Sequence, residues 1–187
     1  MNLIEFEELY STNAYAKENF DNLKNFDVVS ANLQTKGHGQ FERAWYSSNE
    51  NGGNCYLTIV LKPDKLEHID KLTRFASDMV AKTLKEYKLK PTFKYPNDVL
   101  INGKKIAGIL AESTFQGSEL KGIALGIGIN LNLQENDLKF IDQPATSVFL
   151  ETKKQINKLE FTTILLDNFY VYYEDLINYG TGGNIDV

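Results

Sequence analysis

Residues 94–112 read K-Y-P-N-D-V-L-I-N-G-K-K-I-A-G-I-L-A-E, and the prediction of the fold starts from them. Asn102-Gly103 predicts a tight hairpin, because a type I′ turn needs positive φ at both central residues. Gly108 interrupts the apolar strand that follows, which is typical of a place where a ligand or another backbone passes close by. Two lysines at the base of this strand and the bend at 96–98 indicate a site for an anionic group, although a surface hairpin with solvated lysines would show the same short motifs.

Composition narrows the class of protein. The chain has 187 residues, of which 42% are apolar, so we expect one globular domain over 1–187. The net charge of −5 argues against a nucleic-acid partner, whose binding would need a basic face. No stretch approaches the roughly 20 apolar residues of a membrane helix, and no secretory signal is visible, so we expect no membrane association. Cys55 stands alone, which favours a reducing cytoplasm.

The order of periodic segments predicts an α+β fold with a mixed, mostly antiparallel sheet and helices packed on one face. A helix should start at the capping residues 11–13 and run to about residue 23. The apolar stripe of a second helix predicts core packing. Loops are expected at 35–45 and 134–146. Strands are expected at 2–8, 28–33, 54–62, in the opening hairpin, at 109–115 and at 120–133, and the later helices at 66–87 and 158–178.

The loop at 35–45, T-K-G-H-G-Q-F-E-R-A-W, carries groups that suit a nucleotide. Gly37 and Gly39 let backbone N–H groups approach an anion. Arg43 can make forked hydrogen bonds to phosphate oxygens, and Trp45 offers a flat face for a base. A glycine pair alone is weak evidence, because a mobile surface loop would show it too.

Two further segments suggest ligand contacts. Ser11, Thr12 and Asn13 precede a helix, where hydroxyl and amide groups can cap the helix or bind a neutral polar ligand. Gly126 and Gly128 alternate along a strand and leave one face bare, so a flat group could lie there. A neighbouring helix crowding the strand would explain the same glycines.

Taken together, these motifs resemble those of biotin–protein ligases. Residues 94–112 resemble the K-W-P-N-D…K-x-A-G-I-L signature, with tyrosine at 95 in place of tryptophan. S-T-N, G-I-G-I-N and A-T-S also stand at the family's places, and the resemblance covers about residues 5–178. The loop at 35–45 resembles the family's G-R-G-R-x-G-R-x-W. Its departures are His38, Gln40 and Glu42, which replace two arginines and a glycine.

The resemblance implies a catalytic domain of the biotin and lipoate ligase type, similar to class II synthetases. It implies a two-step reaction in which biotin and ATP, with Mg²⁺, form an adenylate. A lysine of a biotin carboxyl carrier protein, from acetyl-CoA carboxylase or a related carboxylase, then takes the biotinyl group. The loop would act as a lid, and Gln40 in place of arginine predicts that the adenylate escapes more readily.

The resemblance also implies roles for individual residues. Lys105 would be catalytic, because the biotin carboxylate and the α-phosphate about 4 Å apart repel by roughly 4 kcal/mol at an effective dielectric of 20. Lys104 should point to the opposite face. Biotin would contact Ser11, Thr12, Asn13, Gln34, Gly37, His38, Gly39, Gln40, Lys105 and Gly108. The second catalytic group would be Arg43, which would bind the adenylate together with Trp45, Lys94, Asn97, Asp98 (also the candidate for Mg²⁺) and Asn130.

Alternatives stay open at this point. Lipoate ligases and octanoyl transferases share the superfamily but usually carry a Gly-Gly-Gly run and a nearby His-Asp, which this sequence lacks. A non-catalytic biotin binder is supported only by the altered loop. About ten residues precede the S-T-N motif and few follow the region of resemblance, so we expect no N-terminal helix-turn-helix, and therefore no transcriptional role, and no small C-terminal β-barrel. A homodimer is compatible with the family, in which monomers also occur.

Overall fold

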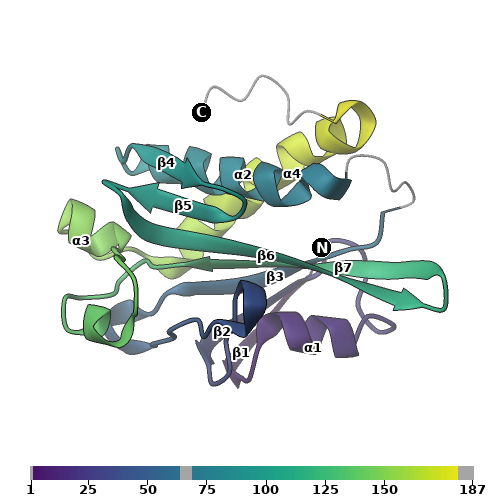
Figure 1. The fold of residues 1–187 in the computed structure, drawn as a ribbon, viewed down its shortest axis with the longest axis horizontal. Helices are drawn as coiled ribbons and strands as arrows, with labels where there is room; N and C mark the ends of the chain where they lie inside the picture. Colours follow the sequence, from purple (N-terminus) through teal and green to yellow (C-terminus); the bar gives the residue numbers. More distant parts are fainter. Residues whose placement is uncertain (1, 64–68, 181–187) are drawn as a thin grey trace.

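The centre of the molecule is a seven-stranded sheet with the order β1-β2-β3-β7-β6-β5-β4 (Figure 1). The computed structural model describes residues 2–63 and 69–180. β1 and β2 pair in parallel and the other neighbouring strands are antiparallel, so the predicted mixed, mostly antiparallel sheet is confirmed. The strands are β1 (Leu3–Leu9), β2 (Val28–Gln34), β3 (Cys55–Leu61), β4 (Pro91–Lys94), β5 (Asp98–Ile101), β6 (Lys104–Gln116) and β7 (Glu119–Ile129).

Helices cover both faces of this sheet. The two long helices, α2 and α4, pack on one face and form the larger apolar core with it, as predicted (Figure 1). α1 packs on the opposite face through Ala16, against Val29, Val60 and Ala124. The prediction of helices on a single face missed this, because β3 is buried on both sides and shows no alternation. The helices are α1 (Thr12–Glu18), α2 (Leu72–Glu86), α3 (Val148–Thr152) and α4 (Lys158–Tyr179).

Short 3₁₀ turns connect several elements. They are η1 (Gln40–Glu42), η2 (Glu50–Gly52), η3 (Ile69–Lys71) and η4 (Asp137–Phe140). Among the described residues, none of the helices combines the length and apolar character that crossing a bilayer would require.

Three predicted boundaries differ from the structure by several residues, the others by about one. α1 ends at Glu18 and not near residue 23, because the Asn19 side chain and backbone both donate to the last helical carbonyls. α2 begins at Leu72, after a 3₁₀ turn; residues 66–68 of the predicted helix lie outside the described residues. β7 ends at Ile129 and not at 133, because the Asn54 side chain accepts the next backbone hydrogen bonds, from residues 131 and 132.

The opening hairpin forms as predicted. Asn102 and Gly103 have φ of 51° and 76°, so both central residues of the turn are left-handed, as a type I′ turn requires. The Asn102 side chain also donates to Glu151 of α3 at 3.0 Å. The turn therefore starts β6 at Lys104 and anchors it to the segment that follows the sheet.

Candidate functional site

A cleft with an empty volume of about 890 Å³ lies on the face of the sheet that α1 covers. Gly37 and Asn130 are not part of its lining: Gly37 is buried and accepts from the Trp45 backbone, and Asn130 donates to the Thr146 carbonyl. The other predicted site residues all line the cleft. They are Ser11, Thr12, Asn13, Gln34, His38, Gly39, Gln40, Arg43, Trp45, Lys94, Asn97, Asp98, Lys105 and Gly108.

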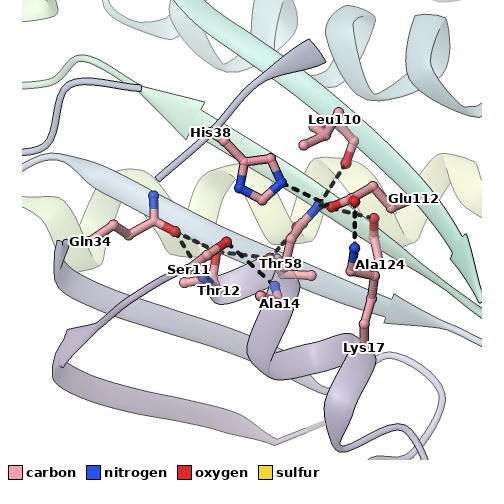
Figure 2. Close-up of polar contacts among 11 residues, drawn as sticks. Ser11, Thr12, Ala14, Lys17, Gln34, His38, Thr58, Leu110, Glu112 and Ala124 are labelled. Carbon is pink, nitrogen blue, oxygen red and sulfur yellow. Dashed lines mark hydrogen bonds and ion pairs between the residues drawn. The ribbon is translucent and has the colours of Figure 1, made fainter. Parts of the chain in front are cut away.

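One end of the cleft is neutral and rich in hydrogen-bonding groups. Gln34 Oε1 accepts from the backbone N–H of Thr12 at 2.8 Å and lies 3.1 Å from its hydroxyl (Figure 2). This orients the amide so that Gln34 presents Nε2 as a donor. Ser11 Oγ accepts from Ala14 at 3.4 Å, so the predicted N-cap is confirmed while the hydroxyl hydrogen can still be donated.

Asn13 lies in the cleft wall, but its amide bonds to other parts of the protein. Nδ2 donates to Glu112 Oε2 at 2.8 Å and to the Leu110 carbonyl at 3.2 Å. Oδ1 accepts from the buried Thr58 hydroxyl at 2.6 Å. Asn13 therefore ties α1 to β6 and β3 and shapes the neutral end of the cleft.

Glu112 joins three segments beside this end, and the sequence predicted no role for it. Its carboxylate pairs with Lys17 of α1 at 2.5 Å and lies 3.7 Å from His38 Nε2 in the loop (Figure 2). Burial raises the pKa of Glu112, but the hydrogen bonds from Lys17 and Asn13 and the nearby charges outweigh it and leave the pKa below its ordinary value. Glu112 therefore stays ionised and pairs with Lys17 of α1, close to His38 of the loop.

The opposite end of the cleft is charged. Lys105 Nζ pairs with Asp98 Oδ1 at 2.7 Å, and both side chains are largely buried. A bulge aims this lysine: Val99 pairs with Ala107 while Leu100 pairs with Lys105, so one extra residue enters β6. Lys104 is exposed, in agreement with its predicted direction.

Trp45 lies on a bare patch of the sheet. Gly108 and Gly128 are cross-strand partners, and a Cβ on either would come within 2.8 Å of the Trp45 ring. Trp45 is thus the flat group against Gly128, one of the two glycines of the predicted pattern; the other, Gly126, is crowded by the Asn13 side chain of α1, as the alternative of a neighbouring helix expected. Lys105 Nζ lies 5.1 Å from the ring centroid. Trp45 Nε1 is buried and has no hydrogen-bond partner within the described part of the chain.

Several lining residues were not predicted. Phe41 stands at the tip of the loop, 87% exposed and with φ of 57°. Leu57 and Ile127 also border the cleft, although both belong to the larger core on the other face of the sheet, and Gln143 reaches the cleft from the segment after β7. The sequence could not predict these residues, because an apolar strand does not show which of its faces borders a site. The position of Gln143 depends on long-range contacts.

The candidate metal ligand, Asp98, already pairs with Lys105. Within residues 2–63 and 69–180, no group of three or more His, Cys, Asp or Glu side chains could hold a metal ion. The residues present fit a Mg²⁺ that is carried mainly by nucleotide phosphates and touched by one carboxylate.

Comparison with known proteins identifies the family. The sequence matches the model of the Biotin/lipoate A/B protein ligase family over residues 5–130. The chain belongs to this family. The match spans all cleft-lining residues except Gln143.

Individual relatives agree with this assignment. The chain is 33% identical over 156 residues to the Bifunctional ligase/repressor BirA of Bacillus subtilis, covering 82% of this chain and 47% of that protein. It is 32% identical over 177 residues to the Biotin--[acetyl-CoA-carboxylase] ligase of Paracoccus denitrificans, covering 91% and 72%. The structure of a biotin protein ligase from Aquifex aeolicus with biotin and ATP superposes with a TM-score of 0.82 at 28% identity, covering 95% and 72%. The chain spans about half the length of the two Bacillus relatives.

Proposed function

We propose that this protein attaches biotin to a lysine of a biotin carboxyl carrier protein, using ATP and a biotinyl-5′-AMP intermediate. The observation that carries the proposal is a single cleft with a neutral hydrogen-bonding end and a charged end around Lys105. Membership of the family and the named activities of the Paracoccus and Aquifex relatives support it.

The neutral end suits the ureido group of biotin, which has two N–H donors and one carbonyl. Ser11 and Gln34 Nε2 would donate to the carbonyl, and the Thr12 oxygen would accept from an N–H. Thr12 and Ser11 are each only 4% exposed, so an analogue that lacked these groups would leave buried polar atoms unpaired.

The charged end suits adenylate formation. A biotin carboxylate oxygen would bond to the α-phosphorus of ATP while the bond to pyrophosphate breaks and pyrophosphate leaves. Lys105 Nζ would donate to both anions, and Asp98, 2.7 Å away, would orient the amine. The exposed side chains of Arg43 and Lys94 at the cleft would bind phosphate oxygens. Mg²⁺ bound to the nucleotide would supply further charge neutralisation.

In the second step the acceptor lysine amine would attack the acyl carbon, forming an amide and releasing AMP. The adenylate must be shielded from water until then. The loop at 35–45 closes on itself through hydrogen bonds from Gly39 N to the Arg43 carbonyl and from Trp45 N to the Gly37 carbonyl. Because residues of this loop line the cleft, it would serve as the lid.

The test is biotin-dependent exchange of pyrophosphate into ATP, followed by transfer of labelled biotin to a carrier domain. We expect both with the wild type. Lys105→Ala should reduce exchange by about 100-fold or more, because a donor to the developing charge is lost. Lys104→Ala, the exposed neighbour, is the matched control and should retain wild-type exchange.

Three other outcomes of the exchange assay would each change a part of this proposal. Exchange that depends on lipoate and not on biotin would identify a lipoate ligase. Biotin binding without exchange would indicate a non-catalytic binder. If exchange persists in Lys105→Ala, the ligase function would stand, but Lys105 would not have its proposed role in adenylate formation.

A further inference from the structure

The segment 134–146, which we call the strap, is held at one end by the residue next to Trp45. The Tyr46 hydroxyl donates to Asp137 Oδ1 at 3.0 Å. Asp137 is 8% exposed, and its other oxygen accepts from the Gln134 backbone at 2.7 Å. The ring of Tyr46 also stacks on Phe140, with centroids 5.6 Å apart and planes 8° from parallel.

The other end of the strap is held by the backbone of Lys105. Lys105 N donates to the Pro144 carbonyl and Thr146 N donates to the Lys105 carbonyl, each at 2.9 Å. Asn130 Nδ2 donates to the Thr146 carbonyl at 3.0 Å. Gln143, between the two anchored ends, lines the cleft. The strap therefore connects Trp45 with Lys105, the two side chains in contact at the charged end.

Tyr46 is suited to hold this arrangement at neutral pH. Burial, and then the hydrogen bond to Asp137, raise the pKa of Tyr46 to about 12, so the hydroxyl keeps its proton. Removing the hydroxyl would leave a buried carboxylate with one donor fewer and would loosen the strap beside Trp45. The neutral end would keep its own hydrogen bonds among Thr12, Gln34 and Thr58.

We propose that Tyr46 is a positioning residue for nucleotide binding: its hydrogen bond to Asp137 holds the strap so that Trp45, Gln143 and Lys105 form one wall of the ATP subsite. The identity of the ligand rests on the proposed function. The geometry of the wall does not depend on it, because each of its contacts joins two residues of the chain itself.

The variant Tyr46→Phe keeps the ring and its stacking and removes only the hydroxyl. In the exchange assay we expect the KM for ATP to rise about five- to tenfold, which corresponds to about 1–1.4 kcal/mol and lies within the range for one ordinary hydrogen bond, while the KM for biotin stays within twofold. Tyr10→Phe is the matched control, because Tyr10 also donates to a carboxylate, that of Glu18, but on the exposed surface. Equal rises in both KM values, or none, would overturn the proposal.

A second readout separates this inference from the proposed function. Trp45 is the only tryptophan in the chain, so its fluorescence reports the wall directly. Without ligand, we expect acrylamide to quench Trp45 fluorescence more strongly in Tyr46→Phe than in the wild type. In titrations with ATP, we expect the Kd of Tyr46→Phe to be about five- to tenfold higher. If the wild type shows no exchange, but Tyr46→Phe still weakens ATP binding, the proposed ligase function would be wrong and the role of Tyr46 would stand. Unchanged quenching and ATP affinity, or no ATP binding by wild type, would overturn the inference.

Discussion

At the scale of single residues, hydrogen atoms decide what the neutral end can bind. Thr58 is fully buried and has one hydroxyl hydrogen, which the 2.6 Å contact assigns to Asn13 Oδ1. The Thr12 hydroxyl, 2.9 Å from Thr58 and 3.1 Å from Gln34, then donates to one of these two oxygens. Its own oxygen is left as an acceptor, which is the polarity that a ureido N–H requires.

This polarity predicts the effect of Thr12→Val. Valine keeps the shape but removes the acceptor, so we expect the KM for biotin to rise about tenfold or more, because a buried ligand N–H would lose its partner. The KM for ATP should change little. Thr12→Ser keeps the hydroxyl and should stay near wild type. A valine variant that binds biotin normally would show that the ureido group lies elsewhere in the cleft.

At the scale of elements, the bulge in β6 explains both what the sequence predicted and what it could not. Lys105 and Gly108 are three residues apart, so strict alternation would place them on opposite faces. Ile106 is the extra residue, and both it and Ala107 are buried in the core, which brings Lys105 and Gly108 to the cleft together. The Asn102-Gly103 turn was predictable because its chemistry is local. The bulge depends on register with β5 and has no local signal.

The same limit applies to contacts between distant segments. Asn130, which the resemblance implies for the adenine, donates its amide to the Thr146 carbonyl, a contact that no local pattern predicts. The Tyr46 to Asp137 and Lys17 to Glu112 contacts join residues more than 90 positions apart. Residue types predicted which groups could form the site, but only the packed sheet determines which of them hold one another in place.

Glu112 allows an element-scale prediction about pH. Its pKa is lowered on folding, so ionised Glu112 stabilises the fold fully above its ordinary pKa of 4.5, and this contribution is lost as the pH falls through the folded value. Glu112→Gln should therefore lower the free energy of unfolding at pH 7 by about 1 kcal/mol, measured by urea denaturation. The difference should shrink below pH 4.5.

Glu119→Gln, an exposed change on the same β6–β7 hairpin, provides the control and should show neither effect. A constant difference between Glu112→Gln and wild type from pH 7 down to pH 3 would mean that the cluster does not depend on the charge of Glu112.

At the scale of the whole molecule, one face of the sheet holds the larger apolar core and the other face holds the cleft. α2 and α4 bury the larger apolar core on one face. α1 lies on the other face (Figure 1). There a smaller apolar cluster adjoins the cleft, which is lined by polar groups and by glycines. Stability and ligand binding should therefore respond to different sets of substitutions.

Phe169 tests this division from the core face. It is fully buried on α4, packs edge-on against Phe75 at 5.2 Å and stacks on Tyr173 at 5.5 Å. Phe169→Ala should lower the free energy of unfolding by about 3–5 kcal/mol, measured by urea denaturation, because it leaves a cavity in the larger core. In the fraction that stays folded, the KM values for biotin and ATP should stay within twofold of wild type. Phe169→Leu, with a smaller cavity, should lose less stability and keep the same KM values. A rise in either KM that tracks the loss of stability across the two variants would show instead that the sheet transmits changes in its core to the cleft.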